Sequence, residues 1–173
     1  MDDLTKLPHQ LNDKQSQCRA IIETPKGSRS KLSYDPETKL FHMKRVLPKG
    51  MAFPFDFGFI PSTVGGDGDP LDVLVLMDDA TPVGCMLDVR LIGVIQAEQT
   101  ENGKTNSNDR LLAIAIPSND YEDVKSLERV NRNILSQIEE FFASYNRQFG
   151  KEFRVTGHGG PKEAVRIVKA GSR

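Results

Sequence analysis

Short apolar runs alternate with polar turns over the first 117 residues, and this pattern predicts a series of short strands. Asp35-Pro36 begins a polar turn between two of these runs, which predicts a β-hairpin. Residues 99–109 are polar with one glycine and are expected to form a loop. The spacing of the runs favours a small barrel. The strands are expected at residues 19–25, 30–35, 39–47, 72–76, 85–98 and 110–117.

The period then changes to steps of three and four, which predicts one long amphipathic helix over residues 124–149 that stops at Gly150. A short strand at 151–157 and a second helix from Pro161 to residue 170 follow. Residues 1–17 show no period and are expected to form a loose arm with one helical turn. The pattern therefore predicts an α+β class, with a small β-barrel and helices against it, in a single domain over residues 1–173.

Four phenylalanines occupy alternate positions before the carboxylate-rich stretch of the chain. They are Phe53, Phe55, Phe57 and Phe59. In an extended chain, alternate side chains point to the same side, so all four are expected to face a core or the wall of a cleft.

Composition narrows the classes of protein. A length of 173 residues favours one domain, and a net charge of −1 gives no general attraction to nucleic acid or to an anionic membrane. Two cysteines, Cys18 and Cys85, do not make a disulfide framework, so a reducing compartment is expected. The first residues lack the apolar core of a signal peptide, and no stretch reaches the roughly 18 apolar residues of a membrane span. A cytoplasmic protein is expected.

Three aspartates lie within six residues of the segment from Gly65 to Asp72, which we call the carboxylate loop. Asp67, Asp69 and Asp72 would repel one another unless protons or cations compensate. Divalent cations with oxygen ligands are the natural compensation, and carboxylates with retained waters suit Mg²⁺. An acidic turn that faces solvent is the alternative for an Asp-Gly-Asp sequence taken alone.

The wider sequence around this loop resembles the family I soluble inorganic pyrophosphatases. The segment GDGDPLDVLV is similar to the family signature, and FPFDFGFIP, LIGVI, AIAIP and FFASYN match its setting. The resemblance extends from Ile21 to Val155. It implies a five-stranded OB-like barrel with flanking helices, hydrolysis of pyrophosphate to two phosphates with several Mg²⁺ ions, and a homo-oligomer, often a hexamer in bacteria.

The resemblance also implies roles for the acidic residues. Asp67 and Asp72 match metal ligands, with Asp72 bridging two ions. Asp69 matches the carboxylate that helps to deprotonate the attacking water. Glu23 matches a glutamate that acts on the metals largely through water.

Further metal carboxylates are expected from the polar segment before residue 110. Asp109 is the first candidate there, with Glu101 or Glu98 as the other. Any of these three acids, taken alone, has the ordinary alternative of a solvated loop residue.

Four residues match groups that bind the phosphates, and Phe57 stands beside them in the expected cleft. The four are Lys31, Arg45, Arg110 and Tyr145. A surface cation or an interface tyrosine is the ordinary alternative for each of them.

Some positions depart from the family pattern, so part of the phosphate site looks reduced. Phe53 and Phe57 stand where the family commonly has tyrosines, Ser33 where it has a glutamate, and Asn146 where it has a lysine that Arg147 could replace. Two other readings therefore stay open. One is a related enzyme with weakened activity or another phosphoanhydride substrate. The other is an OB-type binding module, although acids on its working surface would repel nucleic acid.

Overall fold

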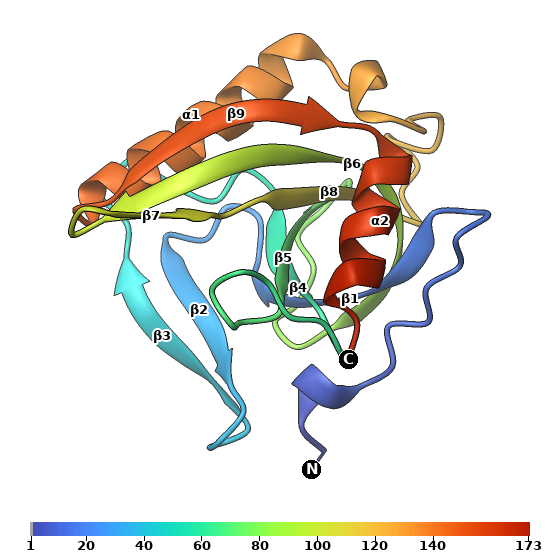
Figure 1. Ribbon diagram of the computed structural model, residues 1–173, viewed down its shortest axis with the longest axis horizontal. Coiled ribbons are helices and arrows are strands. Elements are labelled where there is room, and N and C mark those ends of the chain that lie inside the picture. The colour runs from blue at the N-terminus through green and yellow to red at the C-terminus, as the bar shows by residue number, and fades with distance from the viewer. Residues whose placement is uncertain (1) are drawn as a thin grey trace.

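Five strands close into a small barrel at the centre of the fold (Figure 1). The computed structural model describes residues 2–173. The ring order is β1, β4, β5, β8 and β6, and β6 pairs with β1 to complete it; the β5–β8 pair is parallel and the others are antiparallel. The barrel that the sequence predicts is confirmed. Its strands are β1 (Gln17–Thr24), β4 (Asp56–Ile60), β5 (Leu71–Leu76), β6 (Met86–Glu101) and β8 (Arg110–Ala115).

Strand β6 is 16 residues long and extends beyond the barrel, where it pairs with β7 (Lys104–Ser107) and β9 (Glu152–Gly159). The prediction of a loop over residues 99–109 is therefore wrong, because most of this segment forms a hairpin. Asn102 and Gly103 have positive φ angles of 51° and 74°, as a tight turn of type I′ requires. All four residues of β7 are exposed, so the strand lacks the apolar alternation that would have announced it.

Two helices cover different parts of the barrel (Figure 1). α1 (Arg132–Gln148) lies along β9, and α2 (Pro161–Gly171) packs against β6. The predicted start of the first helix at residue 124 is wrong, because Asn131 caps α1 through a 2.8 Å hydrogen bond from the Asn133 amide. Before this cap the chain forms the short 3₁₀ helix η2 (Leu127–Arg129).

Alternate residues of the barrel strands bury two separate apolar clusters. In β5, Leu74 and Leu76 join the cluster that contains Ile138 and Phe142 of α1. Val73 and Val75 instead join the cluster that contains the apolar residues of α2. The period of two along the strand thus supplies a buried surface to each helix.

The four alternating phenylalanines are all buried, and they divide between two apolar clusters. Phe53, Phe55 and Phe57 join the cluster beneath α1. Phe59 packs with Tyr34, with ring centroids 6.3 Å apart, in a third cluster. Phe53, Phe57 and Phe59 nevertheless line one cleft, as the prediction of a shared side requires, whereas Phe55 packs against Tyr121 instead.

A separate antiparallel hairpin of β2 (Ser30–Asp35) and β3 (Leu40–Val46) stands beside the barrel, as its turn sequence predicts (Figure 1). The N-terminal segment has the one expected turn, the 3₁₀ helix η1 (Leu4–Lys6). The amide of Leu4 donates to the Tyr34 hydroxyl at 3.1 Å, and the Thr5 carbonyl accepts from the Ser62 amide at 2.6 Å. These bonds tie the segment to the hairpin and to the chain after β4.

Candidate active site

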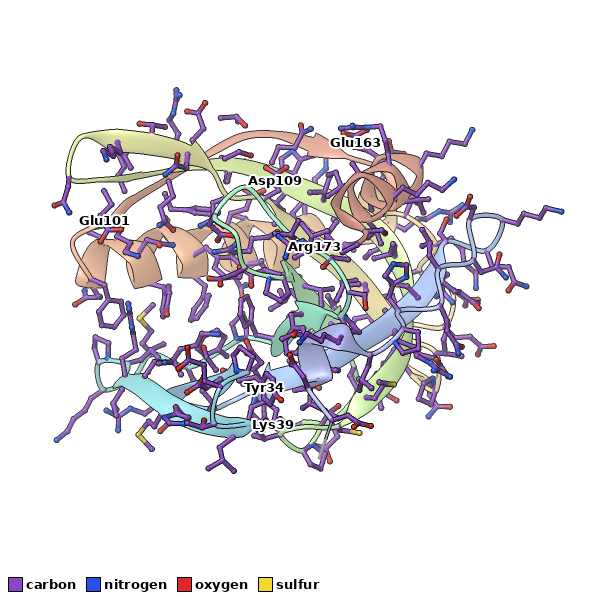
Figure 2. The ribbon with its side chains drawn as sticks, turned by 60° about the horizontal axis from the view of Figure 1, so that its bottom comes forward. Tyr34, Lys39, Glu101, Asp109, Glu163 and Arg173 are labelled. Carbon is purple, nitrogen blue, oxygen red and sulfur yellow. The ribbon has the colours of Figure 1, made fainter. Side chains whose placement is uncertain are left out.

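A cleft of about 430 Å³ opens between the carboxylate loop, the β2–β3 hairpin and the last turns of α1. Figure 2 views this side of the molecule, with Tyr34 on the hairpin and Asp109 near the carboxylate loop. Acidic groups enter the cleft from β1 and the carboxylate loop, and basic groups enter from β2, β3, β8 and the segment before β9. The acids are Glu23, Asp67, Asp69 and Asp72, and the bases are Lys31, Lys44, Arg45, Arg110 and Lys151.

The carboxylate loop is held in a tight turn by its own backbone. The Gly65 amide donates to the Asp69 carbonyl at 2.7 Å, and the Asp69 amide donates to the Asp67 carboxylate at 3.1 Å. Gly68 has a φ of 90°, a conformation that costs glycine little. Asp67 and Asp69 are exposed at the turn, whereas Asp72 is half-buried in β5. The fold therefore fixes Asp72 most firmly.

The carboxylates of the loop repel one another. Burial raises the pKa of Asp69, and the charges of Asp67 and Asp72 raise it further. Such repulsion between carboxylates is relieved by cations, and the oxygen ligands suit Mg²⁺ or another hard divalent ion. Among residues 2–173, no three His, Cys, Asp or Glu side chains converge on one point. The residues fit cations that keep several waters, rather than an ion enclosed by protein ligands.

Two of the four carboxylates are already paired with cations of the protein. Asp72 accepts a hydrogen bond from Nη1 of Arg110 at 2.5 Å, and Glu23 lies 3.6 Å from Nζ of Lys31. Burial raises the pKa of Glu23, while the Lys31 charge opposes that shift. Burial likewise lowers the pKa of Lys31, against the charges of Glu23 and Asp72. Asp67 and Asp69 have no such partner among the described residues, so they hold the uncompensated charge.

Aromatic rings support the cations on the opposite side of the cleft. Nζ of Lys31 lies 4.0 Å from the ring centre of Phe57, and the Arg45 guanidinium lies 3.9 Å from that of Phe149. Both distances allow a cation–π attraction. Burial raises the pKa of Tyr145, and the charge of Arg45 opposes that shift. Phe57 thus lacks a hydroxyl but still helps to place a cation.

Comparisons with known proteins agree with this arrangement. The family model for inorganic pyrophosphatase matches residues 20–173. An inorganic pyrophosphatase from Synechocystis is 35% identical over 155 residues, which cover 90% of this chain and 88% of the relative. The chain belongs to the inorganic pyrophosphatase family. A second relative, the inorganic pyrophosphatase of Methanosarcina acetivorans, is 35% identical over 86% of each chain. The structure of the Thermus thermophilus inorganic pyrophosphatase superposes with a TM-score of 0.89 at 29% identity and covers 98% of this chain and 97% of its own.

Most of the residues to which the family resemblance gives a role lie together in this pyrophosphatase fold. The cleft gathers Glu23, Lys31, Arg45, Phe57, Asp67, Asp69, Asp72, Arg110 and Tyr145. They come from β1, β2, β3, β4, the carboxylate loop, β8 and α1, so contacts far apart in the sequence assemble the site.

Asp109 does not line this cleft. Its carboxylate accepts from the Ala97 amide at 3.1 Å and borders a neighbouring cavity of about 280 Å³ that Asp67 and Asp72 also line. Asn108 lines the cleft instead. Residues 108 and 109 lie between β7 and β8, where the Asn108 side-chain oxygen accepts from Nη1 of Arg110 while the Asp109 carboxylate is held by the Ala97 amide. No signal in the sequence would have found Asn108.

The other two acids of that segment also lie outside the cleft lining. Glu101 pairs with Lys151 at 3.3 Å, and Figure 2 shows it at the far end of the β6–β7 hairpin, away from Asp109. Glu98 pairs with Arg154 at 2.6 Å. Lys151 itself lines the cleft, a position that no sequence motif indicated.

At the end of α1, Asn146 differs from the family pattern, and Asn146 and Arg147 leave the cleft without a cation from this helix. Asn146 is 3% exposed, and its amide donates to the Phe142 carbonyl at 2.8 Å within the same helix. Arg147 is exposed and lies 3.7 Å from Glu140, so its side chain is engaged outside the cleft. Neither residue brings a positive charge into this family member's cleft, although Lys151 enters it from the segment that follows.

Proposed function

We propose that this chain hydrolyses inorganic pyrophosphate to two phosphates, with a water activated by divalent cations as the nucleophile. The observation that carries the proposal is one cleft lined by four carboxylates and five cations of the protein, in which two of the carboxylates pair with cations and two do not. We call its carboxylates the acidic wall and its cations the basic wall. A dianionic or more highly charged substrate needs such cations on its phosphate groups, and the facing acids suit metal ions that accompany it. Membership of the inorganic pyrophosphatase family supports the same reaction.

The acidic wall is the metal-binding and water-activating half of the proposed site. Asp67 and Asp72 would hold the cations, and Glu23 would act on them through water. When bound, divalent cations supply positive charge that makes a water easier to deprotonate and screens the incoming phosphate. Asp69 is exposed at the loop, where its carboxylate would accept the proton of the attacking water.

The basic wall would bind the phosphate groups of pyrophosphate. Lys31 and Arg45 are held at the cleft by Phe57 and Phe149, so their donors are placed before substrate enters. Arg110 and the hydroxyl of Tyr145 would add further donors. Charge-assisted hydrogen bonds from these groups would favour the departing phosphate as its negative charge grows.

Magnesium is the cation that the proposed site suits best. Its acidic ligands are exclusively carboxylates, and they stand apart from one another in an open cleft. Mg²⁺ usually keeps several waters and is held by one or two carboxylates together with substrate phosphates. Asp109, which lies behind the loop, and Glu101, at the end of the hairpin, would then contribute to the metals only through water or through a movement of the loop.

The proposed function predicts phosphate release from pyrophosphate that requires Mg²⁺ and stops on addition of EDTA. The uncompensated charges of Asp67 and Asp69 are the physical reason, since without cations they repel the substrate. Phosphate should be measured with purified protein at fixed ionic strength, with ATP and tripolyphosphate as the competing phosphoanhydrides. Release that persists in EDTA would exclude the metal mechanism. A preference for ATP or tripolyphosphate would favour the alternative of another phosphoanhydride substrate.

We also propose a homo-oligomer, of which a hexamer is one form. Three apolar side chains of β3 are largely exposed: Leu40 at 61%, Met43 at 62% and Val46 at 54%. β3 pairs with β2 on one side, and exposed apolar strands of this kind favour association with another chain. Light scattering at micromolar concentration should give a multiple of 19.3 kDa. A monomeric mass would contradict the proposal.

A further inference from the structure

We infer that Arg110 is an internal counter-cation, which occupies Asp72 in the metal-free protein and sets the metal concentration at which the site fills. The inference rests on the proposed function, because it assigns Asp72 to a metal. Asp72 is the proposed metal ligand that the fold holds most firmly. In this inference Arg110 competes with the metal for Asp72, instead of supporting Asp72 permanently.

The contacts of Arg110 place its charge on Asp72. Nη1 donates to the Asp72 carboxylate at 2.5 Å, to the side-chain oxygen of Asn108 and to the Asp109 carbonyl at 3.3 Å. The Arg110 side chain is 8% exposed, whereas that of Asp72 is 28% exposed. The bond occupies Oδ2 of Asp72, so a metal ion that needs this oxygen must displace Arg110 from it. The cation of the protein and a metal therefore compete for Asp72.

The guanidinium is only partly satisfied in this position. All three of these acceptors gather on Nη1, while the buried Nε of Arg110 has no hydrogen-bond partner among the described residues. A guanidinium in a structural ion pair commonly uses two parallel bonds to one carboxylate. The phenyl ring of Phe142 lies 5.2 Å from the guanidinium carbon and stabilises the charge without fixing its direction. Arg110 can therefore leave Asp72 without losing a complete set of bonds.

The charges around the pair make this exchange selective for a cation. Asp67 and Asp69 lie on the same loop as Asp72 and have no basic partner among residues 2–173, so they attract a metal toward the position that Arg110 holds. Lys31 is engaged with Glu23 and is not the partner of Asp72. A metal that binds only when Asp72 is released has an apparent Kd equal to its intrinsic Kd divided by the released fraction. Arg110 thus weakens metal binding in the absence of substrate.

The test is the binding of Mg²⁺ to metal-free protein, measured by isothermal titration calorimetry without substrate. Arg110→Gln should lower the Kd for Mg²⁺ by about tenfold, the change expected if Asp72 is paired for about nine-tenths of the time. Arg45→Gln is the matched control, because Arg45 is a cation of the same cleft that stacks on Phe149. In Arg45→Gln, the loss of one positive charge should change the Kd for Mg²⁺ by about threefold or less at physiological ionic strength.

Thermal unfolding supplies a second measurement that does not depend on activity. Without metal, Arg110→Gln should unfold at a lower temperature than the wild type, because Asp72 loses its partner. Saturating Mg²⁺ should then raise the Tm of the variant by more than it raises that of the wild type, since the metal replaces the missing cation. If Arg110→Gln does not fold, Arg110→Lys keeps the charge without the planar fork, and its Kd should fall at least about threefold.

The inference is overturned if Mg²⁺ binds Arg110→Gln no more tightly than the wild type, or if Arg45→Gln gives an equal gain. An unchanged Kd in Arg110→Lys would overturn it where the glutamine variant cannot be made. Its failure differs from failure of the proposed function. If only the inference about Arg110 fails, the wild type still releases phosphate from pyrophosphate. If only the proposed function fails, Arg110→Gln still binds Mg²⁺ more tightly than the wild type, but the wild type does not hydrolyse pyrophosphate.

Discussion

Replacing Asp72 by asparagine is expected to lower kcat for pyrophosphate by about 10³-fold while the protein remains folded. The change removes one negative charge from the acidic wall but keeps the size of the side chain. A loss of about 4 kcal/mol of transition-state stabilisation corresponds to this factor. If Asp72 bridges two cations, its neutral form would weaken or misplace both of them. The fold should persist because an asparagine oxygen can still accept from Arg110, and a loss of about 1–2 kcal/mol of stability is expected.

The measurement for this variant is steady-state phosphate release at saturating Mg²⁺, together with a urea denaturation midpoint. Asp79→Asn is the matched control. Asp79 is exposed beyond the other end of β5, and its carboxylate accepts from the Ala80 amide at 2.8 Å. The control should keep its turnover within about twofold, as surface substitutions usually do. Near-normal kcat in Asp72→Asn would show that Asp72 serves only to hold the turn.

Replacing Gly58 by alanine is expected to destabilise the fold by more than about 4 kcal/mol, enough to unfold much of the protein. Gly58 pairs with Ile22 where β4 crosses β1. A Cβ at this position would lie 1.9 Å from the carbonyl oxygen of Ile21 and 2.8 Å from its carbonyl carbon. Both atoms belong to the backbone, so no rotamer change relieves the clash. The two strands would have to separate, which breaks the barrel where it joins the wall that contains Glu23.

Urea denaturation followed by circular dichroism measures this effect, and Gly66→Ala is the control. The nearest atom to a Cβ on Gly66 would be the Ser107 carbonyl oxygen at 3.7 Å, an ordinary contact distance. The control should stay within about 1 kcal/mol of the wild type. A folded Gly58→Ala protein with an unchanged midpoint would mean that β1 and β4 are not packed as closely as the structure has them.

The sequence was most informative where one short segment determines a local structure. The carboxylate loop could be predicted because its glycines, Pro70 and its aspartates are contiguous, and the strand that follows is plainly apolar. The barrel strands could be predicted because β5 and β8 are buried on both faces, so they stand out in the sequence as short continuous apolar runs between turn signals. The β6–β7 hairpin could not be found in this way, because its strand β7 buries no side chain and is determined by the turn at Asn102 and Gly103.

The parts of the site that the sequence did not predict depend on distant contacts. Arg110 and Asp72 are 38 positions apart, and their bond follows from the pairing of β5 with β8. The sequence shows that Phe149 follows Tyr145 by four residues, which places both rings on one side of the helix. It does not show that Phe149 contacts Arg45, which belongs to β3. The choice between Asn108 and Asp109 was decided by their contacts with Arg110 and with the Ala97 amide, which a motif match does not take into account.

The parallel pairing of β5 with β8 has a consequence for the order in which the protein can be built. β8 separates β5 from β6, although β5 and β6 are consecutive ring strands in the chain. A growing polypeptide that has reached the end of β6 can pair β1 with β4 and β6, but one edge of β5 and one edge of β6 stay open until residues 110–115 have been added. Open strand edges invite pairing with other chains. An unfinished barrel is therefore vulnerable to aggregation until β8 joins both of these edges at once, and the part of β6 that pairs with β9 stays open until residues 152–159 have been added.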